Sequence, residues 1–276
     1  MNNFVRYTCV FVCLLPGLRS FAADSAVAPD ASTNTALPVP KLAPEYPDKK
    51  TVILAMARDT NEEIFTQLHS FVCNEEIHRF KGWTNEETIK PIDTVQTNVS
   101  FENGTEHYSE IRQNEKVRPS LSSLSGAWSE GEFGTLLGQT QKLLHETRPM
   151  FESFTELEGI PAAIYAIDVM AAESPWVLQV GSQHGQVPFR TRIWVSQSGG
   201  QILKIERASL GLPFESGIGE IRWDVSLKQV ELNGRTWLLP STGNYVVAYK
   251  SSRREWNVMQ FSNYRRYASE VAIRFE

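Results

Sequence analysis

The side chains that could carry out chemistry are spread along the chain without the spacing that chemistry needs. No two of the five histidines stand in an HExxH or similar metal-binding arrangement, and each is interpreted as solvent-facing. Adjacent glutamates point to opposite faces of a strand and lie about 100° apart on a helix, so neither arrangement is a ready acid–base dyad. The residues concerned are His69, His78, His107, His145, His184, Glu62-Glu63, Glu75-Glu76 and Glu86-Glu87.

Nucleophile and phosphate-binding patterns are missing as well. The serine-rich stretch 120–129 lacks a GxSxG elbow, and residues 215–219 hold two glycines without the loop-to-helix layout of a phosphate cradle. Cys73 follows Phe71 and Val72, which favours a small buried hydrophobe over a catalytic thiol with a basic partner. We therefore expect no catalytic residue, no metal ligand and no cofactor, and we interpret the chain as a protein that is not an enzyme.

Composition excludes several classes of protein. The chain has 276 residues, of which 41% are hydrophobic and 21% charged, as in ordinary globular domains. With 27 Lys and Arg against 32 Asp and Glu, it lacks the basic excess that binds a phosphate backbone, so no nucleic-acid partner is expected.

The first residues have the features of a secretory signal, which we place at 1–22. Arg6 supplies the positive charge, residues 10–15 form a short apolar core, and Ser20 and Ala22 suit a cleavage site. The alternative, a buried helix, is disfavoured for an uncovered apolar run at the N-terminus. The run is too short to cross a membrane, so the mature chain should have no transmembrane segment. We expect an exported protein, periplasmic or extracellular.

Removing the signal changes the chemistry of the chain. Cys9 and Cys13 leave with it, so Cys73 is the only thiol of the mature protein, and the net charge falls from −5 to −7. Residues 23–48 hold five prolines with few large apolar side chains, a composition typical of a disordered tether. The third part, 49–276, is predicted to be a single β-rich domain.

Two helices are expected in this domain. Apolar residues recur at helical spacing over 49–70 and, more clearly, over 129–146. Ser129 and Glu132 have the spacing of a capping box, which predicts that the second helix begins there.

Antiparallel strands account for the rest of the predicted domain. Short turns join successive strand patterns from Val72 onward, as in a meander. The alternation of Ile221 to Leu227 slips by one residue before Val230, which predicts a bulge near Gln229. Residues 160–171 are apolar on both faces, so something must cover the second face: the helices, another sheet or a ligand. The fold class is therefore α+β, a curved half-barrel-like meander with an N-terminal helix and a mid-chain helix on one face.

Several short phrases resemble the periplasmic lipoprotein-carrier superfamily. They are Ile193-Trp194-Val195 with the strand Ile202 to Glu206 after a glycine turn, and Trp237-Leu238-Leu239-Pro240. Residues 60–276 also look like a group of uncharacterised bacterial exported proteins, on Phe71 to Ile77 and on Gly131-Glu132-Phe133-Gly134. The resemblance implies an unclosed half-barrel with helices on its concave side. No residue maps onto a position of the carriers that handles cargo, so activity does not follow from the shared fold.

Aromatic residues suggest two interpretations of the interior. They make up 11% of the chain and either fill a large curved core or line an apolar cavity for an acyl chain. The candidate lining of such a cavity is Phe133, Leu136, Leu137, Ile164, Ile167, Trp194, Trp223 and Trp237.

The sequence thus favours an exported cell-envelope protein that binds a hydrophobic or lipidic ligand in its half-barrel. The alternative is a structural or protein-interaction module of the envelope without a small ligand, whose partner is another envelope protein. A hydrolytic enzyme is the third interpretation, and no pair of residues supplies it with a nucleophile and a base.

Overall fold

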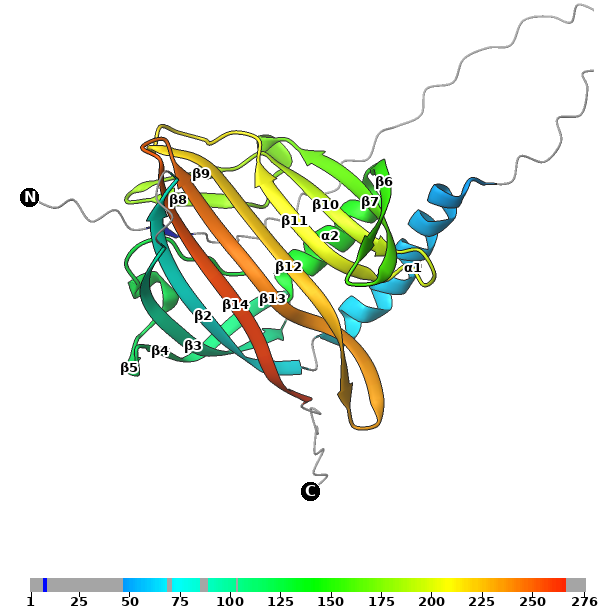
Figure 1. The fold of residues 1–276 in the computed structure, drawn as a ribbon, viewed down its shortest axis with the longest axis horizontal. Coiled ribbons are helices and arrows are strands. Elements are labelled where there is room, and N and C mark those ends of the chain that lie inside the picture. The colour runs from blue at the N-terminus through cyan, green and yellow to red at the C-terminus, as the bar shows by residue number, and fades with distance from the viewer. Residues whose placement is uncertain (1–6, 9–46, 69–70, 85–88, 103, 267–276) are drawn as a thin grey trace, which may run out of the picture.

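An antiparallel sheet of eleven strands frames the protein (Figure 1). The computed structural model describes residues 7–8, 47–68, 71–84, 89–102 and 104–266. The predicted signal peptide 1–22 and tether 23–48 lie outside these residues, apart from positions 7, 8, 47 and 48, and stay predictions. The α+β class and the open, mainly antiparallel sheet are confirmed.

The order of the strands shows how the chain is laid out. It enters in mid-sheet at β2, runs outward to β5 at one edge, crosses to β6 at the other edge, and returns strand by strand until β14 pairs with β2. The strands of this sheet are β2 (Phe71–Trp83), β3 (Lys90–Glu102), β4 (Thr105–Gln113), β5 (Lys116–Val117), β6 (Met150–Leu157), β7 (Ile160–Val169), β10 (Phe189–Ser196), β11 (Ile202–Ser209), β12 (Ile218–Leu232), β13 (Arg235–Tyr249) and β14 (Arg253–Arg266).

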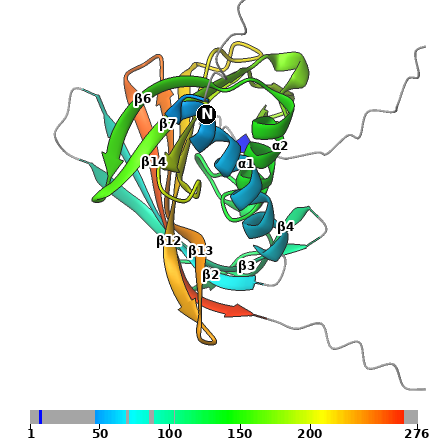
Figure 2. The ribbon, with the colours of Figure 1, turned by 90° about the vertical axis from the view of Figure 1, so that its right-hand side faces the viewer.

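Two helices cover one face of this sheet, which we call the inner face (Figure 2). They are α1 (Lys49–Leu68) and α2 (Thr135–Glu146), and they lie side by side. The smaller elements are β1 (Tyr7–Thr8), β8 (Val177–Val180) and β9 (Gln183–Gln186), which form a separate three-stranded sheet, and the short 3₁₀ helices η1 (Leu121–Ser123) and η2 (Ala171–Glu173). The part of the chain that the structure describes holds no helix long and apolar enough to cross a membrane.

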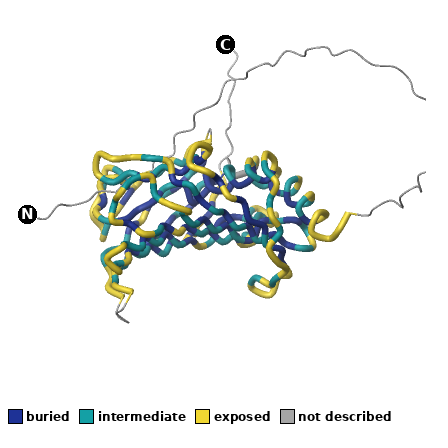
Figure 3. The backbone as a smooth tube through the Cα atoms, turned by 90° about the horizontal axis from the view of Figure 1, so that it is seen from above, coloured by how far each residue is buried: buried dark blue, intermediate teal, exposed yellow. Residues whose placement is uncertain are grey.

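Along the central strands, buried residues alternate with half-buried or exposed ones, which separates the inner face from the outer face (Figure 3). In β2 every second side chain from Phe71 to Arg79 is buried, and the residues between them are half-buried. The inward side chains of the strands join those of α1 and α2 in one hydrophobic cluster. The β12–β13 register shifts between Ser226 and Leu227, where Ser241 of β13 is passed over. From Leu227 to Leu232 the pairing is continuous, so the bulge expected near Gln229 is not found there.

Asn61 attaches α1 to the sheet. Its Nδ2 donates to the Gly200 carbonyl at 2.8 Å and its Oδ1 accepts from the Ile202 amide at 2.9 Å. Gly200 has φ +72°, and a Cβ there would lie 2.6 Å from the backbone of Met56. The turn before β11 can therefore approach the helix only because this residue is glycine.

Arg79 ties the segment between β5 and α2 to the inner face. Its guanidinium forms a two-point ion pair with Asp93, at 2.6 and 2.5 Å, and donates to the Ser125 carbonyl at 2.9 Å. Both charged side chains are almost fully buried. An arginine–carboxylate fork of this kind fixes geometry as well as charge.

We expect Arg79→Met to lower the free energy of unfolding by about 3–5 kcal/mol, because it leaves Asp93 buried without its cation. Urea unfolding measures the change. The matched control is Arg190→Met, which breaks an equally well-formed pair with Asp168 whose side chains are more than one-third exposed. That substitution should cost about 1 kcal/mol or less. Equal losses for the two variants would contradict the assigned role of the buried pair.

Candidate functional site

The space between the sheet and α2 holds buried ionisable groups in addition to the Arg79–Asp93 pair. They lie in two clusters: a carboxyl cluster of Glu75, Glu106, Glu130 and Glu132 at the start of α2, and a second cluster around Arg207 beneath the middle of α2.

Glu106, on β4, caps α2. Its carboxylate accepts from the amides of Gly134 at 2.7 Å, Thr135 at 2.9 Å and Gly131 at 3.2 Å. A negative charge at this position satisfies free N–H groups and is favoured by the helix dipole. The predicted capping box at Ser129 is therefore wrong as a helix start: α2 begins six residues later, at Thr135.

Ser129 and Glu132 still bond to each other, since the serine hydroxyl donates to the Glu132 carboxylate. The pair stands before the helix rather than on its first turn. The reason for the difference lies in the tertiary structure: the cap comes from a strand that is more than 20 residues away, and no local pattern encodes it.

Glu75 occupies an inward position on β2, where none of the described residues forms a hydrogen bond with its carboxyl group. Its side chain is 2% exposed, and neither carboxyl oxygen has a partner. Burial, followed by the negative charges of Glu132, Glu106 and Glu130, raises the pKa of Glu75 well above its usual range. Burial close to other carboxyl groups therefore favours the protonated, neutral form of Glu75.

The same causes act on the two glutamates that precede α2. Burial, and next the charge of Glu106, raises the pKa of Glu132 to about 8 and that of Glu130 to about 7. The carboxyl cluster thus carries protons near neutral pH. Within the described residues, no group of three or more His, Cys, Asp or Glu side chains is placed to hold a metal ion.

Arg207, on β11, is a fully buried cation. Its Nη1 donates to the Gln139 Oε1 on α2 at 2.6 Å, and its guanidinium lies 4.4 Å from the centre of the Phe189 ring. The Nε and Nη2 atoms are buried without an acceptor. Desolvation lowers the pKa of Arg207 to about 9, so it stays charged at neutral pH.

The structure divides the eight candidate lining residues between the two faces. Phe133, Leu136, Leu137, Ile167 and Trp223 lie in the inner cluster, and Trp237 packs against it. Ile164 and Trp194 are half-buried partners on neighbouring strands. Strand alternation puts Trp194 on the outer face, where the Lys204 ammonium lies over its ring. They are therefore not brought together with the other six.

The two-sided apolar character of residues 160–171 has a simpler origin than a second layer. On β7, Tyr165, Ile167 and Val169 point inward, while the outer face carries Ala162 and Ala166, both fully buried. Alanines are short enough to be covered by the side chains of the flanking strands.

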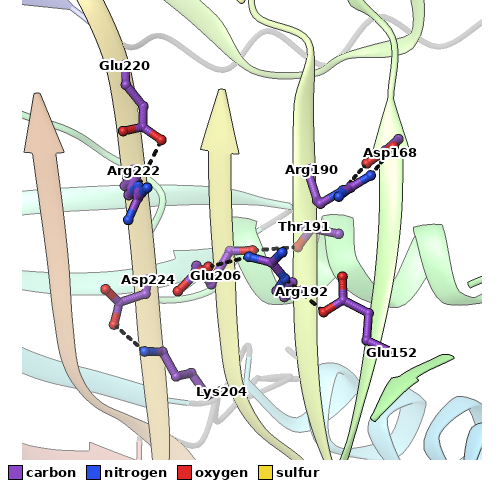
Figure 4. Close-up of polar contacts among 10 residues, drawn as sticks. All are labelled: Glu152, Asp168, Arg190, Thr191, Arg192, Lys204, Glu206, Glu220, Arg222 and Asp224. Atoms are coloured by element: carbon purple, nitrogen blue, oxygen red, sulfur yellow. Dashed lines mark hydrogen bonds and ion pairs between the residues drawn. The ribbon is translucent and has the colours of Figure 1, made fainter. Parts of the chain in front are cut away.

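Charges on the outer face are paired across strands (Figure 4). Arg190 forms two bonds with Asp168, Arg192 reaches Glu152 at 2.9 Å, and Lys204 reaches Asp224 at 3.3 Å. These groups satisfy one another in solvent, which contrasts with Glu75 and Arg207 inside.

Two hollows open on this outer face. One, of about 350 Å³, lies among Phe80, Trp83, Ile89 and Trp256, and the other, of about 270 Å³, is lined mostly by amides and carboxylates such as Asn74 and Glu110. The second hollow has Glu75 of the carboxyl cluster among its lining residues. Neither hollow is lined by Arg207, Glu106, Glu130 or Glu132.

Sequence reasoning missed Glu75, Glu106, Gln139 and Arg207. Two of them left a signal. Arg207 stands in phase with Leu203 and Ile205, and Glu75 stands between Cys73 and Ile77 on the same alternating face. A charge that keeps step with apolar neighbours in a strand predicts a buried ionisable group. Cys73 is fully buried, as the sequence predicted.

Three solved structures are similar to this chain. A LolA superfamily protein from Nitrosomonas europaea matches at 14% identity and TM-score 0.39, over 79% of this chain and 93% of that one. A DUF1329 family protein from Desulfovibrio piger matches at 12% identity and TM-score 0.41, over 83% of this chain and 96% of that one. An outer membrane lipoprotein-sorting protein domain from Vibrio parahaemolyticus matches at 8% identity and TM-score 0.37, over 80% of this chain and 94% of that one.

The lipoprotein-carrier group that the sequence phrases resemble is thus found among these structures. No protein-family profile and no curated protein matches the sequence. With TM-scores below 0.5, the function has to be argued from this chain's own geometry.

We expect the stability of the protein to fall as pH rises from about 5 to 8. A carboxyl whose folded pKa is about 8, against 4.5 when unfolded, holds its proton longer in the folded state. Between these values each such group lowers the free energy of unfolding by up to about 1.4 kcal/mol per pH unit.

Urea unfolding at several pH values tests this. Glu132→Gln should flatten the pH profile, whereas Glu156→Gln, at an exposed position of β6, should leave it as in the wild type. A wild-type profile that is level between pH 5 and 8 would refute the raised pKa values.

Proposed function

We propose that the protein is an exported binding protein of the cell envelope that holds a hydrophobic or lipidic ligand between the sheet and its two helices. The observation that carries this proposal is the mismatch beneath α2. Apolar side chains fill most of the interior, yet buried polar atoms of Arg207 and Gln139 have no partner. Unpaired groups of this kind cost free energy in the closed protein, so the fold gains by accepting another molecule there.

The way in which α2 is held suits such an exchange. Gln141 and Arg58 bond α2 to α1, at 2.8 and 2.7 Å, so the helices form a pair. Directional bonds from α2 to the sheet involve Glu106 at its start and Arg207 at its middle. The remaining contacts are apolar and non-directional, and an acyl chain can replace them.

The tight packing of the two helices suggests that they move together. A Cβ on Gly138 would lie 2.5 Å from the Phe65 ring, so α2 and α1 touch closely at this point. We expect a ligand to enter between the helix pair and the sheet rather than between the helices.

Native mass spectrometry of the full chain, purified from its own envelope and followed by organic extraction, tests the proposal. We expect a co-purifying apolar molecule, and we expect the stripped protein to bind oleyl alcohol. Leu137→Phe should weaken this binding several-fold, because it adds volume at a buried position of α2.

Trp194→Leu is the matched control for that experiment, since its side chain belongs to the outer face. Its affinity for oleyl alcohol should equal that of the wild type. A chain that carries no extractable molecule and binds no oleyl alcohol would contradict the proposal. Thermal melting of both variants shows whether each is folded.

A further inference from the structure

The surroundings of Arg207 contain hydrogen-bond donors without acceptors. Four buried N–H-bearing atoms have no hydrogen-bond partner within the described part of the chain: Nε and Nη2 of Arg207, Nε2 of Gln139 and Nε1 of Trp176. They belong to one neighbourhood, because Gln139 bonds to Arg207 and the Phe189 ring contacts both Arg207, at 4.4 Å, and Trp176, at 5.9 Å between ring centres.

The orientation of the Gln139 amide follows from this arrangement. A guanidinium can only donate, so the amide must turn its oxygen toward Arg207, as it does, and its nitrogen is then left as a further donor. The unpaired atoms of this cluster are all hydrogen-bond donors. The partner that satisfies them is therefore a group that accepts several hydrogen bonds.

The positive charge of Arg207 indicates that the group accepting these hydrogen bonds is an anion. Among the residues that the structure describes, no acidic side chain forms an ion pair with Arg207, and desolvation lowers the pKa of this guanidinium. A buried cation without a counter-ion is costly, and the planar fork of a guanidinium matches the two oxygens of a carboxylate or phosphate.

Resting on the function proposed above, we infer that Arg207, with Gln139 and Trp176, is the binding site for the anionic head of an amphiphilic ligand, a carboxylate or a phosphate group. The chain of the ligand would follow the apolar side chains around this site. Phe189, Trp223 and Leu136 are fully or almost fully buried and belong to the same cluster. The head would replace Oε1 of Gln139 as the acceptor for the guanidinium.

A purely structural role for Arg207 makes a different prediction. The cation would then serve only to stack on Phe189 and to hold Gln139, and no ligand would distinguish it from an apolar residue of similar length. Two probes that share one chain and differ in charge separate these roles.

The test compares sodium oleate with oleyl alcohol on the full chain, stripped of co-purifying molecules. We expect Arg207→Met to weaken oleate binding at least about tenfold and to leave oleyl alcohol binding unchanged. Arg192→Met is the matched control, because this arginine lies on the neighbouring strand but faces outward to Glu152. The affinities for oleate and for oleyl alcohol should both equal those of the wild type. The Arg207→Met variant should fold at least as well as the wild type, because it removes an unpaired buried charge.

A measurement on the unmodified protein protects the test against a variant that does not fold. Oleate should shift the ¹⁵N resonance of the Arg207 Nε, and oleyl alcohol should shift it much less. Inorganic phosphate provides the third arm, since it carries the anion without the chain.

The outcomes are distinct. Equal binding of both oleyl probes to wild type and Arg207→Met would overturn the anion site and leave the proposed function standing. Failure of the wild type to bind either probe would overturn the proposed function itself. A response to phosphate as strong as that to oleate would overturn the assignment to an amphiphile.

Discussion

The crossing of the chain from one edge of the sheet to the other determines most of this structure. Strand β5 ends at one edge and β6 begins at the opposite edge, so the segment between them must pass over the sheet. It does so on the inner face, and α2 is the part that becomes helical. The helix is held at its start by Glu106 and before it by Arg79, which bonds to Ser125. The curvature of the sheet and the position of α1 then complete an interior that a flat sheet would not have.

Charged side chains are paired on the outer face of the sheet but only partly paired on the inner face. Outside, arginine, lysine and carboxylates pair across strands, and each pair contributes little because water screens it. On the inner face, Arg79 and Asp93 form an ion pair with each other. Within the described residues, Glu75 and Arg207 each keep buried polar atoms that have no hydrogen-bond partner. Burial favours the neutral, protonated form of Glu75, whereas an arginine keeps its charge at neutral pH. Arg207 is for this reason the group of the interior that most needs a partner from outside the chain.

The sequence was sufficient to predict the architecture because periodicity is a local property. Alternation predicted the meander, and helical spacing predicted α1 from Lys49. The start of α2 was not predictable, since Glu106 on a distant strand provides the cap. The site was only partly predictable, because the residue type of an aromatic such as Trp194 does not indicate which face of the sheet it occupies. Its position in the alternation with Phe189 and Ile193 places it on the outer face.

The pairing of β14 with β2 has a consequence for how the protein is made. These are the last and the first strands of the large sheet, and they meet near its middle rather than at an edge. Until the final strand has been synthesised, β2 presents a row of free backbone groups, the kind of edge at which chains associate wrongly. Many contacts also join residues far apart in sequence, which slows folding. A product that stops before Arg253 would expose two unpaired edges in the centre of the sheet, those of β2 and β13.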